Sequence, residues 1–253
     1  MNTNIKISAS IVLYNENIKD LEKTILSFLK TTFQKQLFLI DNSPSNNFSL
    51  NQILINKEVV YIKNDKNLGF GKAHNLILDK TDSNYHLILN PDIEFNSKIF
   101  IDLISELENN QYLSMISPEV LYPNGKLQYT CRQNPTIREM VSRRVGFNKK
   151  YVDKRQYLNK NLSNPFYPEF IHGCFMLFKT DDFIKLNGFD ERYFLYMEDA
   201  DICRKIKESG KEILYYPKVN ITHIHRKGSA KKIKLLFYHI SSAIKYFRKW
   251  GFS

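Results

Sequence analysis

Apolar residues in the N-terminal part of the chain follow two patterns that alternate. Short runs rich in β-branched residues cover 5–14, 36–40, 59–62 and 85–89. Between the first two runs, apolar residues recur at helical spacing from Ile18 to Leu29, and a second helix is expected over 73–80. Strands that alternate with helices predict an α/β fold, with an open, mostly parallel central sheet and helices on both faces.

Polar side chains follow three of the predicted strands at the points where these strands end. They are Asn15 after the first run, Asp41 and Asn42 after the second, and Asn90 and Asp92 after the fourth. Parallel α/β sheets bind ligands outside the carboxyl ends of their strands. The sequence therefore predicts a polar ligand at this edge of the sheet.

Asn90-Pro91-Asp92 presents a carboxylate on a turn that the proline stiffens. A single Asp there can hold Mg²⁺ or Mn²⁺ together with substrate phosphates, because these hard cations often take one or two carboxylates plus phosphate oxygens. The alternative is an ordinary Asx-Pro turn that binds nothing. Taken alone, the motif leaves both interpretations open.

The second half of the chain has a less regular pattern. A hairpin turn is expected at 122–125, between extended segments at 115–120 and 126–129, and an apolar strand over 170–178. Helices are expected over 181–186, 198–209 and 231–250. The polar stretch 131–168 has weak periodicity and is expected to be a variable insertion or a mobile loop.

Three acidic residues, Glu198, Asp199 and Asp201, stand at the start of the helix over 198–209. The helix dipole favours acids there whatever their function, but a carboxylate held at a pocket wall is also a suitable general base for an alcohol. Further along, His223 and His225 are alternative partners for Asp92 at a metal ion. Because alternate residues of an extended segment face opposite ways, only one of the two histidines is expected to join it.

Composition and charge narrow the class of protein. The net charge of the 253-residue chain is +11, but 28 of its 37 basic residues are lysines, whereas specific nucleic-acid readers rely on arginine. We therefore expect no nucleic-acid partner. Three widely spaced cysteines exclude a disulfide framework and fit a reducing cytoplasm. The N-terminal residues lack signal-peptide features, and no apolar run approaches the roughly 18 residues that a membrane span needs.

The loop Asn67–Gly71 matches neither GxGxxG nor GxxxxGKS, which excludes a Rossmann dinucleotide site and a Walker-type ATPase. Taken together, however, seven segments resemble the family 2 glycosyltransferases of the GT-A fold, with the rhamnosyltransferase-like branch nearest. They are IVLYN (11–15), LIDNS (39–43), NLGFGKAHN (67–75), LILNPD (87–92), HGCFMLFK (172–179), GFDERYFLYMEDADICRKIKESG (188–210) and THIHRKGS (222–229). The resemblance covers about residues 7–229.

This resemblance implies a fold, a domain division and a donor site. It implies a Rossmann-like central sheet in a glycosyltransferase domain over 1–230, with the nucleotide-sugar half in about 1–120 and the acceptor half in 121–230. A basic amphipathic helix follows in 231–253. The implied donor-binding residues are Tyr14, Asn15, Asp41, Asn42, Asn67, Gly69, Asn75, Asn90 and Asp92. The implied acceptor residues are Phe189, Asp190 and Glu191.

The resemblance also implies the reacting groups. Asn90-Pro91-Asp92 stands where the family has its Asp-X-Asp motif, so Asp92 would hold Mg²⁺ or Mn²⁺, with His223 as second ligand and His225 in reserve. Asp199 would be the catalytic base, and Glu198 would orient it or the acceptor.

The implied reaction is an inverting transfer of a sugar from dTDP-rhamnose or a UDP-hexose to a hydroxyl of a glycan or lipid-linked glycan, in bacterial surface polysaccharide synthesis. Two other interpretations remain. One is a nucleotidyltransferase on a similar sheet, and the other is a non-catalytic basic module that binds a membrane or RNA.

The last helix also bears on where the protein acts. An apolar stripe runs along it, and basic residues are interleaved with that stripe. The helix either packs on the core with a solvated basic face or docks on an anionic membrane, where basic residues near the surface add to binding. Docking would suit a lipid-linked acceptor, and the protein is expected to be cytoplasmic, with this peripheral contact as the alternative.

Overall fold

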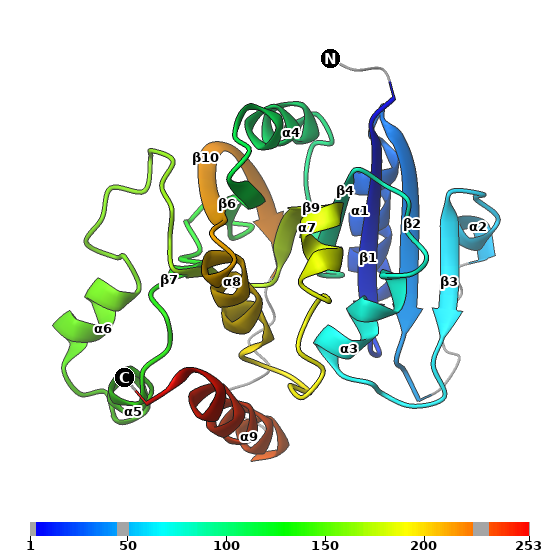
Figure 1. The fold of residues 1–253 in the computed structure, drawn as a ribbon. Coiled ribbons are helices and arrows are strands. Elements are labelled where there is room, and N and C mark those ends of the chain that lie inside the picture. The colour runs from blue at the N-terminus through cyan, green and yellow to red at the C-terminus, as the bar shows by residue number, and fades with distance from the viewer. Residues whose placement is uncertain (1–3, 45–50, 225–232, 253) are drawn as a thin grey trace.

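The computed structural model describes residues 4–44, 51–224 and 233–252. They form an α/β fold around a curled eight-stranded sheet (Figure 1). The strands of this sheet are β1 (Lys6–Leu13), β2 (Gln34–Asp41), β3 (Val59–Lys63), β4 (Tyr85–Leu89), β5 (Ile93–Glu94), β6 (Leu113–Leu121), β9 (Phe175–Lys179) and β10 (Glu212–His223). A separate two-stranded sheet contains β7 (Cys131–Arg132) and β8 (Phe170–Ile171).

Helices connect these strands. They are α1 (Ile18–Leu29), α2 (Asn51–Leu54), α3 (Phe70–His74), the 3₁₀ helix η1 (Asn75–Ile77), α4 (Ile99–Asn109), α5 (Ile137–Val145), α6 (Lys149–Arg155), α7 (Thr180–Lys185), α8 (Glu198–Glu208) and α9 (Ile233–Trp250).

The strand order of the large sheet is β3-β2-β1-β4-β9-β6-β10-β5. The first four strands pair in parallel, as do β6 and β10. Strand β9 runs antiparallel to both β4 and β6, and β5 runs antiparallel to β10. The sheet is therefore mostly parallel, as the sequence predicts. Strand β9 also inserts the second half of the chain directly beside β4 of the first half.

Alternate side chains of the strands pack into two apolar cores, one on each face of the sheet. On one face, Ile7 and Ile11 of β1 pack with residues of α1 and α4. On the other face, Phe38 and Ile40 of β2 pack with residues of α3, α7, α8 and α9. Because both faces are covered, the central strands are continuous apolar runs in the sequence.

Strand β1 interrupts this pattern with two buried serines, Ser8 and Ser10, and Ser10 fixes α3 to the sheet. The Oγ of Ser10 lies 2.7 Å from Nδ1 of His74 and 2.9 Å from Nε2 of His86. Burial lowers the pKa of His86 to about 3 and that of His74 well below its usual value, so both rings are neutral. The contact to His74 holds the end of α3, and with it the loop that precedes this helix.

The prediction of a mobile loop over 131–168 is wrong, because α5 and α6 lie there. Helix α5 begins at Thr136, whose Oγ1 accepts a hydrogen bond from the backbone N–H of Glu139 at 3.2 Å, and it ends at Gly146 in the left-handed region. The residues that α5 buries are Glu139 and Ser142. An apolar periodicity could not identify a helix whose buried face is polar.

Other predicted elements differ in their bounds. The strand expected over 170–178 is two strands in different sheets, because the chain turns at 172–174 and β8 pairs with β7. The helix expected over 73–80 begins earlier, at Phe70, and continues as η1 to Ile77. Helix α4 and strand β10, for which the sequence analysis made no prediction, also belong to the fold.

Helix α9 is fastened to the core by its last turns. Ala243, Tyr246 and Phe247 are buried. Lys249 Nζ lies 2.8 Å from a carboxylate oxygen of Asp201, and Trp250 Nε1 donates to Asp201 at 2.7 Å. One face of the predicted C-terminal helix therefore packs on the core.

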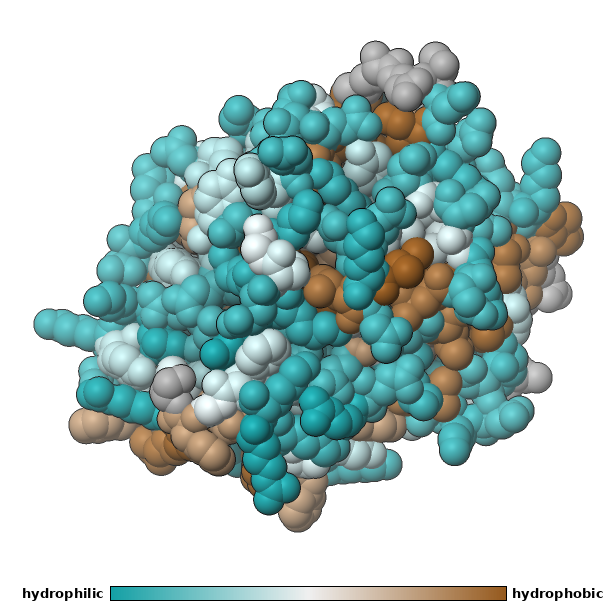
Figure 2. Space-filling model, viewed as in Figure 1, coloured by the Kyte–Doolittle hydropathy of each residue, from teal (hydrophilic) through white to brown (hydrophobic). Residues whose placement is uncertain are grey.

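The opposite side of α9 and its neighbour α5 leave large apolar side chains exposed. Phe237 on α9 is 67% exposed, and Phe147 just after α5 is 69% exposed. Ile240, Ile244, Val141 and Val145 are exposed as well. Figure 2 shows apolar side chains along the lower edge of the molecule, over these two helices and interleaved with polar ones. In the described residues, no helix is long and apolar enough to span a membrane.

Candidate functional site

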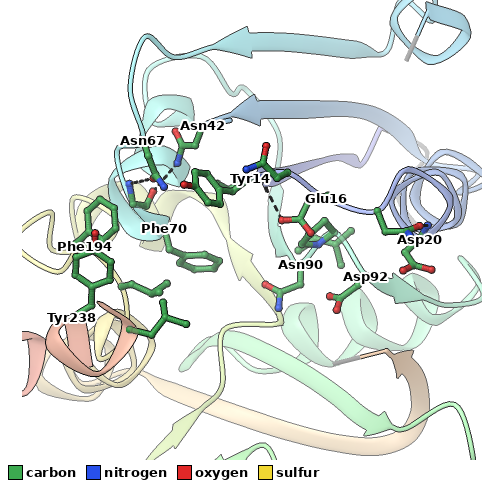
Figure 3. Close-up of a pocket in the computed structure, with 18 of the residues that line it drawn as sticks. Tyr14, Glu16, Asp20, Asn42, Asn67, Phe70, Asn90, Asp92, Phe194 and Tyr238 are labelled. Atoms are coloured by element: carbon green, nitrogen blue, oxygen red, sulfur yellow. Dashed lines mark hydrogen bonds between the residues drawn. The ribbon is translucent and has the colours of Figure 1, made fainter. Parts of the chain in front are cut away.

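A cavity of about 620 Å³ opens at the carboxyl ends of β1, β2 and β4, where the sequence predicts a ligand. Its volume is that of a small-molecule site. It is lined by Val12, Tyr14, Asn15, Glu16, Asn17, Asp20, Asn42, Asn67, Gly69, Phe70, Leu89, Asn90, Pro91, Asp92, Phe194, Leu195, His223, Lys234, Leu235 and Tyr238. In Figure 3, Phe70, Phe194 and Tyr238 form an aromatic side opposite Glu16 and Asp92.

The loop Asn67–Gly71 forms a close-packed wall of the cavity. Gly69 has a φ of 83°, and a Cβ at this position would lie 2.2 Å from the carbonyl oxygen of Phe194. The backbone N–H of Phe70 donates to the same carbonyl at 3.0 Å. Asn67 Oδ1 accepts from Gly69 N at 2.8 Å, and Asn42 Nδ2 donates to Gly69 O at 3.2 Å. Only glycine fits here, because the backbone is both left-handed and pressed against Phe194.

The aromatic side of the cavity comes from the second half of the chain. The rings of Phe194 and Tyr238 lie 4.5 Å apart at an angle of 37°. Tyr238 belongs to α9, and Ser242 of the same helix donates to Leu195 O at 2.8 Å. Helix α9 therefore builds part of the cavity wall.

Asp92 and His223 lie side by side at the other end of the cavity. His223 Nε2 is 3.2 Å from Asp92 Oδ1, and the backbone N–H of Ile224 donates to Asp92 O at 3.0 Å. The Nδ1 of His223 is 3.1 Å from Gln128 Oε1, while Gln128 Nε2 donates to His223 O at 2.6 Å. With Nδ1–H donated to Gln128, the neutral ring would present the lone pair of Nε2 beside Asp92.

This pair suits a divalent cation that also takes phosphate oxygens. The described residues contain no group of three His, Cys, Asp or Glu side chains that could hold a metal. Mg²⁺ and Mn²⁺ at nucleotide sites often need only one or two protein ligands, since the phosphates supply others. A carboxylate and an imidazole at 3.2 Å, both on the cavity wall, fit that requirement. The reserve ligand His225 lies outside the described residues.

The electrostatics of His223 are set by burial and by its neighbours. Burial lowers its pKa, but the hydrogen bond to Asp92 and the contact with Cys174 outweigh burial and raise the pKa to about 10. A cation bound at Nε2 would take the place of that proton.

Glu198 and Asp199 are presented by a strained turn. Tyr196 and Met197, which precede them, have φ values of 70° and 71°, a region that residues other than glycine rarely adopt. Asp199 Oδ1 accepts from Ala200 N at 2.8 Å, and its Oδ2 accepts from Gly173 N at 3.3 Å.

Asp199 is absent from the cavity lining but adjoins it. A Cβ on Gly173 would lie 3.5 Å from Asp199 Cβ and 3.6 Å from the Phe70 ring, which lines the cavity. The next residue, Cys174, accepts from Asn90 N at 2.9 Å. A chain of direct contacts thus runs from Asp199 through 173–174 to the Asn90-Pro91-Asp92 turn.

Burial sets the protonation of the two acids. Burial, followed by the charge of Asp199, raises the pKa of Glu198 to about 8, so Glu198 is mostly neutral at pH 7. Burial also raises the pKa of Asp199, while backbone N–H groups of Ala200 and Gly173 oppose the shift. The two backbone hydrogen bonds favour the ionised form of Asp199, and its charge in turn favours the neutral form of Glu198.

Some predicted site residues have other partners and do not line the cavity. Asp41 is buried and accepts from Tyr61 at 2.6 Å and from Lys63 at 3.0 Å, and these bonds hold its pKa below the usual value despite burial. Asn75 bonds the backbone of Phe189 with its Oδ1 and Nδ2, both at 2.8 Å.

The predicted acceptor residues also have protein partners. Phe189 is buried in the core, Asp190 pairs with Arg192 and Lys249, and Glu191 pairs with Lys72. These residues shape the segment that leads to Glu198.

Sequence analysis missed two groups near the reacting residues. Gln128 was hidden because its contact with His223 spans 95 residues. Arg132 lies in the stretch assigned to a loop, and its charge interacts with that of Asp199. The segment CRQNP (131–135) matches no motif that would have indicated an arginine near Asp199.

The chain matches the family described as Glycosyl transferase family 2 over residues 8–186. A second family, described as the N-terminal domain of galactosyltransferase, matches residues 158–227.

Several curated proteins are similar in sequence. Rhamnosyltransferase WbbL of Escherichia coli is 28% identical over 70% of this chain and 69% of its own length. The N-acetylglucosaminyl-diphospho-decaprenol L-rhamnosyltransferase of Mycobacterium tuberculosis is 25% identical over 70% of this chain and 63% of that protein. The low-salt glycan biosynthesis hexosyltransferase Agl10 of Haloferax volcanii is 24% identical over 81% of this chain and 63% of that protein. Each match thus leaves about a third of the relative's length uncovered.

Solved structures share the fold. GalNAc-T7 with UDP, GalNAc and Mn²⁺ has a TM-score of 0.72 at 18% identity, covering 98% of this chain and 50% of that one. The mannosyltransferase PcManGT from Pyrobaculum calidifontis with GDP-Man and Mn²⁺ has a TM-score of 0.63 at 13% identity, covering 96% and 64%. With the GT-A fold and a family match that extends from β1 to α7, the chain belongs to glycosyl transferase family 2.

Proposed function

We propose that this protein is an inverting glycosyltransferase that moves a sugar from a nucleotide-sugar donor to a hydroxyl of a glycan or lipid-linked glycan. One observation carries the proposal. The Asp92–His223 pair lies in a cavity at the carboxyl edge of the sheet, and Asp199 adjoins the same cavity through 173–174.

The donor would occupy the cavity. Its base and ribose would contact Tyr14, Asn15 and Asn42, and the aromatic side formed by Phe194 and Tyr238 offers stacking surface. The diphosphate would lie toward Asp92 and His223, which would hold a divalent cation between them and the phosphate oxygens. When bound, such a cation neutralises charge that builds up on the leaving diphosphate.

Asp199 would act as the general base. The acceptor oxygen forms a bond to the anomeric carbon while the bond from that carbon to the diphosphate oxygen breaks, and the proton of the acceptor hydroxyl goes to Asp199. The charge arrangement supports this role, because Glu198 is mostly protonated at pH 7 and leaves the negative charge to Asp199. A base and a leaving group on opposite sides of the sugar would invert its configuration.

Donor and acceptor identities rest on the relatives. Two of them are named as rhamnosyltransferases, which favours dTDP-rhamnose over a UDP-hexose as donor. One is named for an acceptor that is a lipid-linked diphosphate, which favours a lipid-linked glycan in bacterial surface polysaccharide synthesis.

A screen for donor hydrolysis and for binding tests the proposal. Calorimetry with dTDP, UDP and GDP, with and without Mn²⁺, is expected to give binding that depends on the metal for one of the three. Hydrolysis of the matching nucleotide sugar should then release free sugar. A protein that binds none of these nucleotides at millimolar concentration would contradict the assignment.

The exposed residues of α5 and α9 support peripheral contact with an anionic membrane. Val141, Val145, Phe237, Ile240 and Ile244 form the apolar part of this α5–α9 surface. Exposed Arg144, Lys234 and Arg248 on the same helices supply positive charge, and each basic residue near an anionic surface adds ~1 kcal/mol. A lipid-linked acceptor would be met on this side.

Vesicle flotation tests this contact. The protein is expected to float with phosphatidylglycerol vesicles and to do so several-fold less after the double change Phe237→Glu and Ile240→Glu. Ile55→Glu is the matched control, because Ile55 is 82% exposed but lies next to α2. Equal flotation of both variants, or none for the unchanged protein, would remove the membrane proposal.

A further inference from the structure

We propose that Arg132 binds a phosphate group of the acceptor beside Asp199. This inference rests on the proposed glycosyl transfer and adds a residue that selects the acceptor. Arg132 lies on β7, whose partner β8 leads directly into the 172–174 turn that contacts Asp199.

The backbone links Arg132 to the segment that contacts Asp199. Arg132 is paired with Phe170 and Cys131 with Ile171, and the N–H of His172 donates to Thr130 O at 3.0 Å. The N–H of Gly173 then donates to Asp199 Oδ2. One two-stranded ribbon therefore carries both the guanidinium and the hydrogen-bond donor of the base.

The guanidinium of Arg132 has unused donors. Its Nε and Nη1 are buried, and neither has a hydrogen-bond partner in the part of the chain that the structure describes. Burial, together with the charge of Arg143, lowers its pKa to about 10, so the side chain is still a cation at pH 7. Buried N–H groups of a partly buried cation are costly when they lack a partner, and a bound ligand would remove that cost.

Neighbouring polar atoms share this property. Among the described residues, Asn134 Oδ1, two residues after Arg132, is buried without a partner, and so is Glu198 Oε2. Buried polar atoms in folded proteins normally form hydrogen bonds. Unpaired atoms occur elsewhere in the core as well, but those of Arg132, Asn134 and Glu198 lie on the segments that lead to Asp199, which supports the binding of a polar group there.

The charges around Arg132 favour an anion. Glu139, whose charge also acts on Arg132, is already engaged by Arg155 and Arg143. Arg143 and Arg144 on α5 add further positive charge, which also acts on His239 of α9. A guanidinium fork matches two phosphate oxygens, which a sugar hydroxyl cannot do.

The position of Arg132 also fits an acceptor anchored in a membrane. Arg132 is separated by a few residues from α5, whose outer side belongs to the α5–α9 surface. A lipid-linked diphosphate would enter from that surface, place a phosphate on Arg132 and direct its sugar hydroxyl to Asp199. The donor diphosphate, by contrast, belongs at Asp92 and His223.

Kinetics with two acceptors test the inference. One acceptor is a short-chain polyprenyl diphosphate sugar, and the other is an alkyl glycoside of the same sugar without phosphate, both in detergent. Arg132→Gln is expected to raise KM for the diphosphate acceptor by ~10- to 100-fold, with kcat, donor KM and donor hydrolysis unchanged. With the alkyl glycoside, the variant should match the unchanged protein. Arg132→Lys should recover part of the loss, and Arg138→Gln, an exposed position on α5, is the control.

Several outcomes would overturn the inference. A fall in kcat that is equal for both acceptors would mean that Arg132 supports Asp199 structurally. A raised donor KM would assign Arg132 to the donor diphosphate. An unchanged protein that does not prefer the diphosphate acceptor would remove the anion site.

Binding of a diphosphate lipid in the absence of a sugar donor tests the anion site independently of the proposed glycosyl transfer. Farnesyl diphosphate is expected to bind the unchanged protein and to bind Arg132→Gln at least ~10-fold more weakly, as measured by calorimetry without donor. If that difference is found while no donor supports transfer, the proposed function fails and the anion site stands. If farnesyl diphosphate binds both proteins equally, the anion site fails whether or not transfer occurs.

Discussion

The donor side and the acceptor side of the site differ in how well their polar groups are paired. On the donor side, Asn42 bonds both Gly69 and Asn64, and Asn67 bonds Gly69. On the proposed acceptor side, buried atoms of Arg132, Asn134 and Glu198 have no partner among the described residues. Among the described residues, none of the buried unpaired side-chain atoms belongs to the cavity lining, whereas several belong to the proposed acceptor side.

This difference separates two ways of binding. A paired network holds its shape and binds a ligand with little rearrangement, because its side chains are already fixed. Unpaired buried groups destabilise the free protein and gain their hydrogen bonds when the substrate arrives. We therefore expect variants of the proposed donor side to change affinity and stability together, and variants of the proposed acceptor side to change acceptor KM or turnover with the fold kept.

Asp199→Asn is expected to have the largest effect. It removes the proton acceptor and should lower transfer by ~10²–10⁴-fold, while nucleotide binding and the melting temperature stay close to those of the unchanged protein. Steady-state transfer assays and calorimetry measure both. Asp181→Asn, an exposed acid on α7, should leave transfer unchanged, and an active Asp199→Asn would exclude Asp199 as the base.

The second largest effects are expected from removal of the divalent cation and from replacement of Gln128, which orients the proposed cation ligand His223. A chelator should abolish transfer, and Mg²⁺ or Mn²⁺ should restore it. Gln128→Leu should weaken Mn²⁺ binding by ~10- to 100-fold, because the His223 ring loses the partner that orients it. Calorimetry of Mn²⁺ with bound nucleotide measures this, with Gln34→Ala as the control. Full turnover in the chelator would mean that basic groups alone neutralise the diphosphate.

Gly69→Ala tests how closely the donor wall is packed. The left-handed backbone should cost about 1 kcal/mol, and the contact with Phe194 O should raise the total to roughly 2 kcal/mol or more and weaken nucleotide binding. Gly210→Ala is the matched control, since Gly210 has a φ of 78° but no atom within 4 Å of an added Cβ. Urea unfolding of both variants separates backbone strain from contact. An equal loss of unfolding free energy in the two variants would show that the contact between residue 69 and Phe194 O adds nothing to the backbone strain.

Glu198→Gln is expected to have the smallest effect at neutral pH, because Gln mimics the protonated acid. The pKa of Glu198 is about 8 in the folded protein and near 4.5 in the unfolded chain. Between pH 4.5 and pH 8, the folded protein therefore binds one proton more than the unfolded chain. Stability should therefore fall as pH rises through this window, at about 1 kcal/mol per pH unit. The Gln variant should lose less stability, which urea unfolding from pH 5 to 9 measures. Parallel pH profiles would mean that Glu198 is charged throughout.

The sequence predicts those site residues whose position follows from the local alternation of strands and turns. Asn15, Asn42, Asn90 and Asp92 line the cavity because each follows a strand of one parallel sheet, and such strands all end at the same edge. Asp41, although it belongs to the same set, turns away to Tyr61 and Lys63. No local pattern could predict that turn, since both partners come from the neighbouring strand β3.

The parts that the sequence misses depend on contacts between distant segments. Gln128 meets His223 because the chain after β6 folds back on that strand and β10 pairs with it, and the segment of Arg132 reaches that of Asp199 because β7 pairs with β8. Helix α5 escaped detection because its buried face is polar. Tertiary contact rather than local propensity decides such positions.

The amino-acid sequence by itself determined the alternation of strands and helices, the edge at which the ligand site lies and the family to which the chain belongs. The reason is that apolar periodicity and strand-end residues are local properties that any copy of this sequence carries. Only the tertiary structure decided which polar groups are paired, that α9 walls the cavity, and that the strand of Arg132 pairs with the strand that leads to the contact of Gly173 with Asp199. Those facts follow from burial and from pairing between remote segments, which the order of residues does not contain.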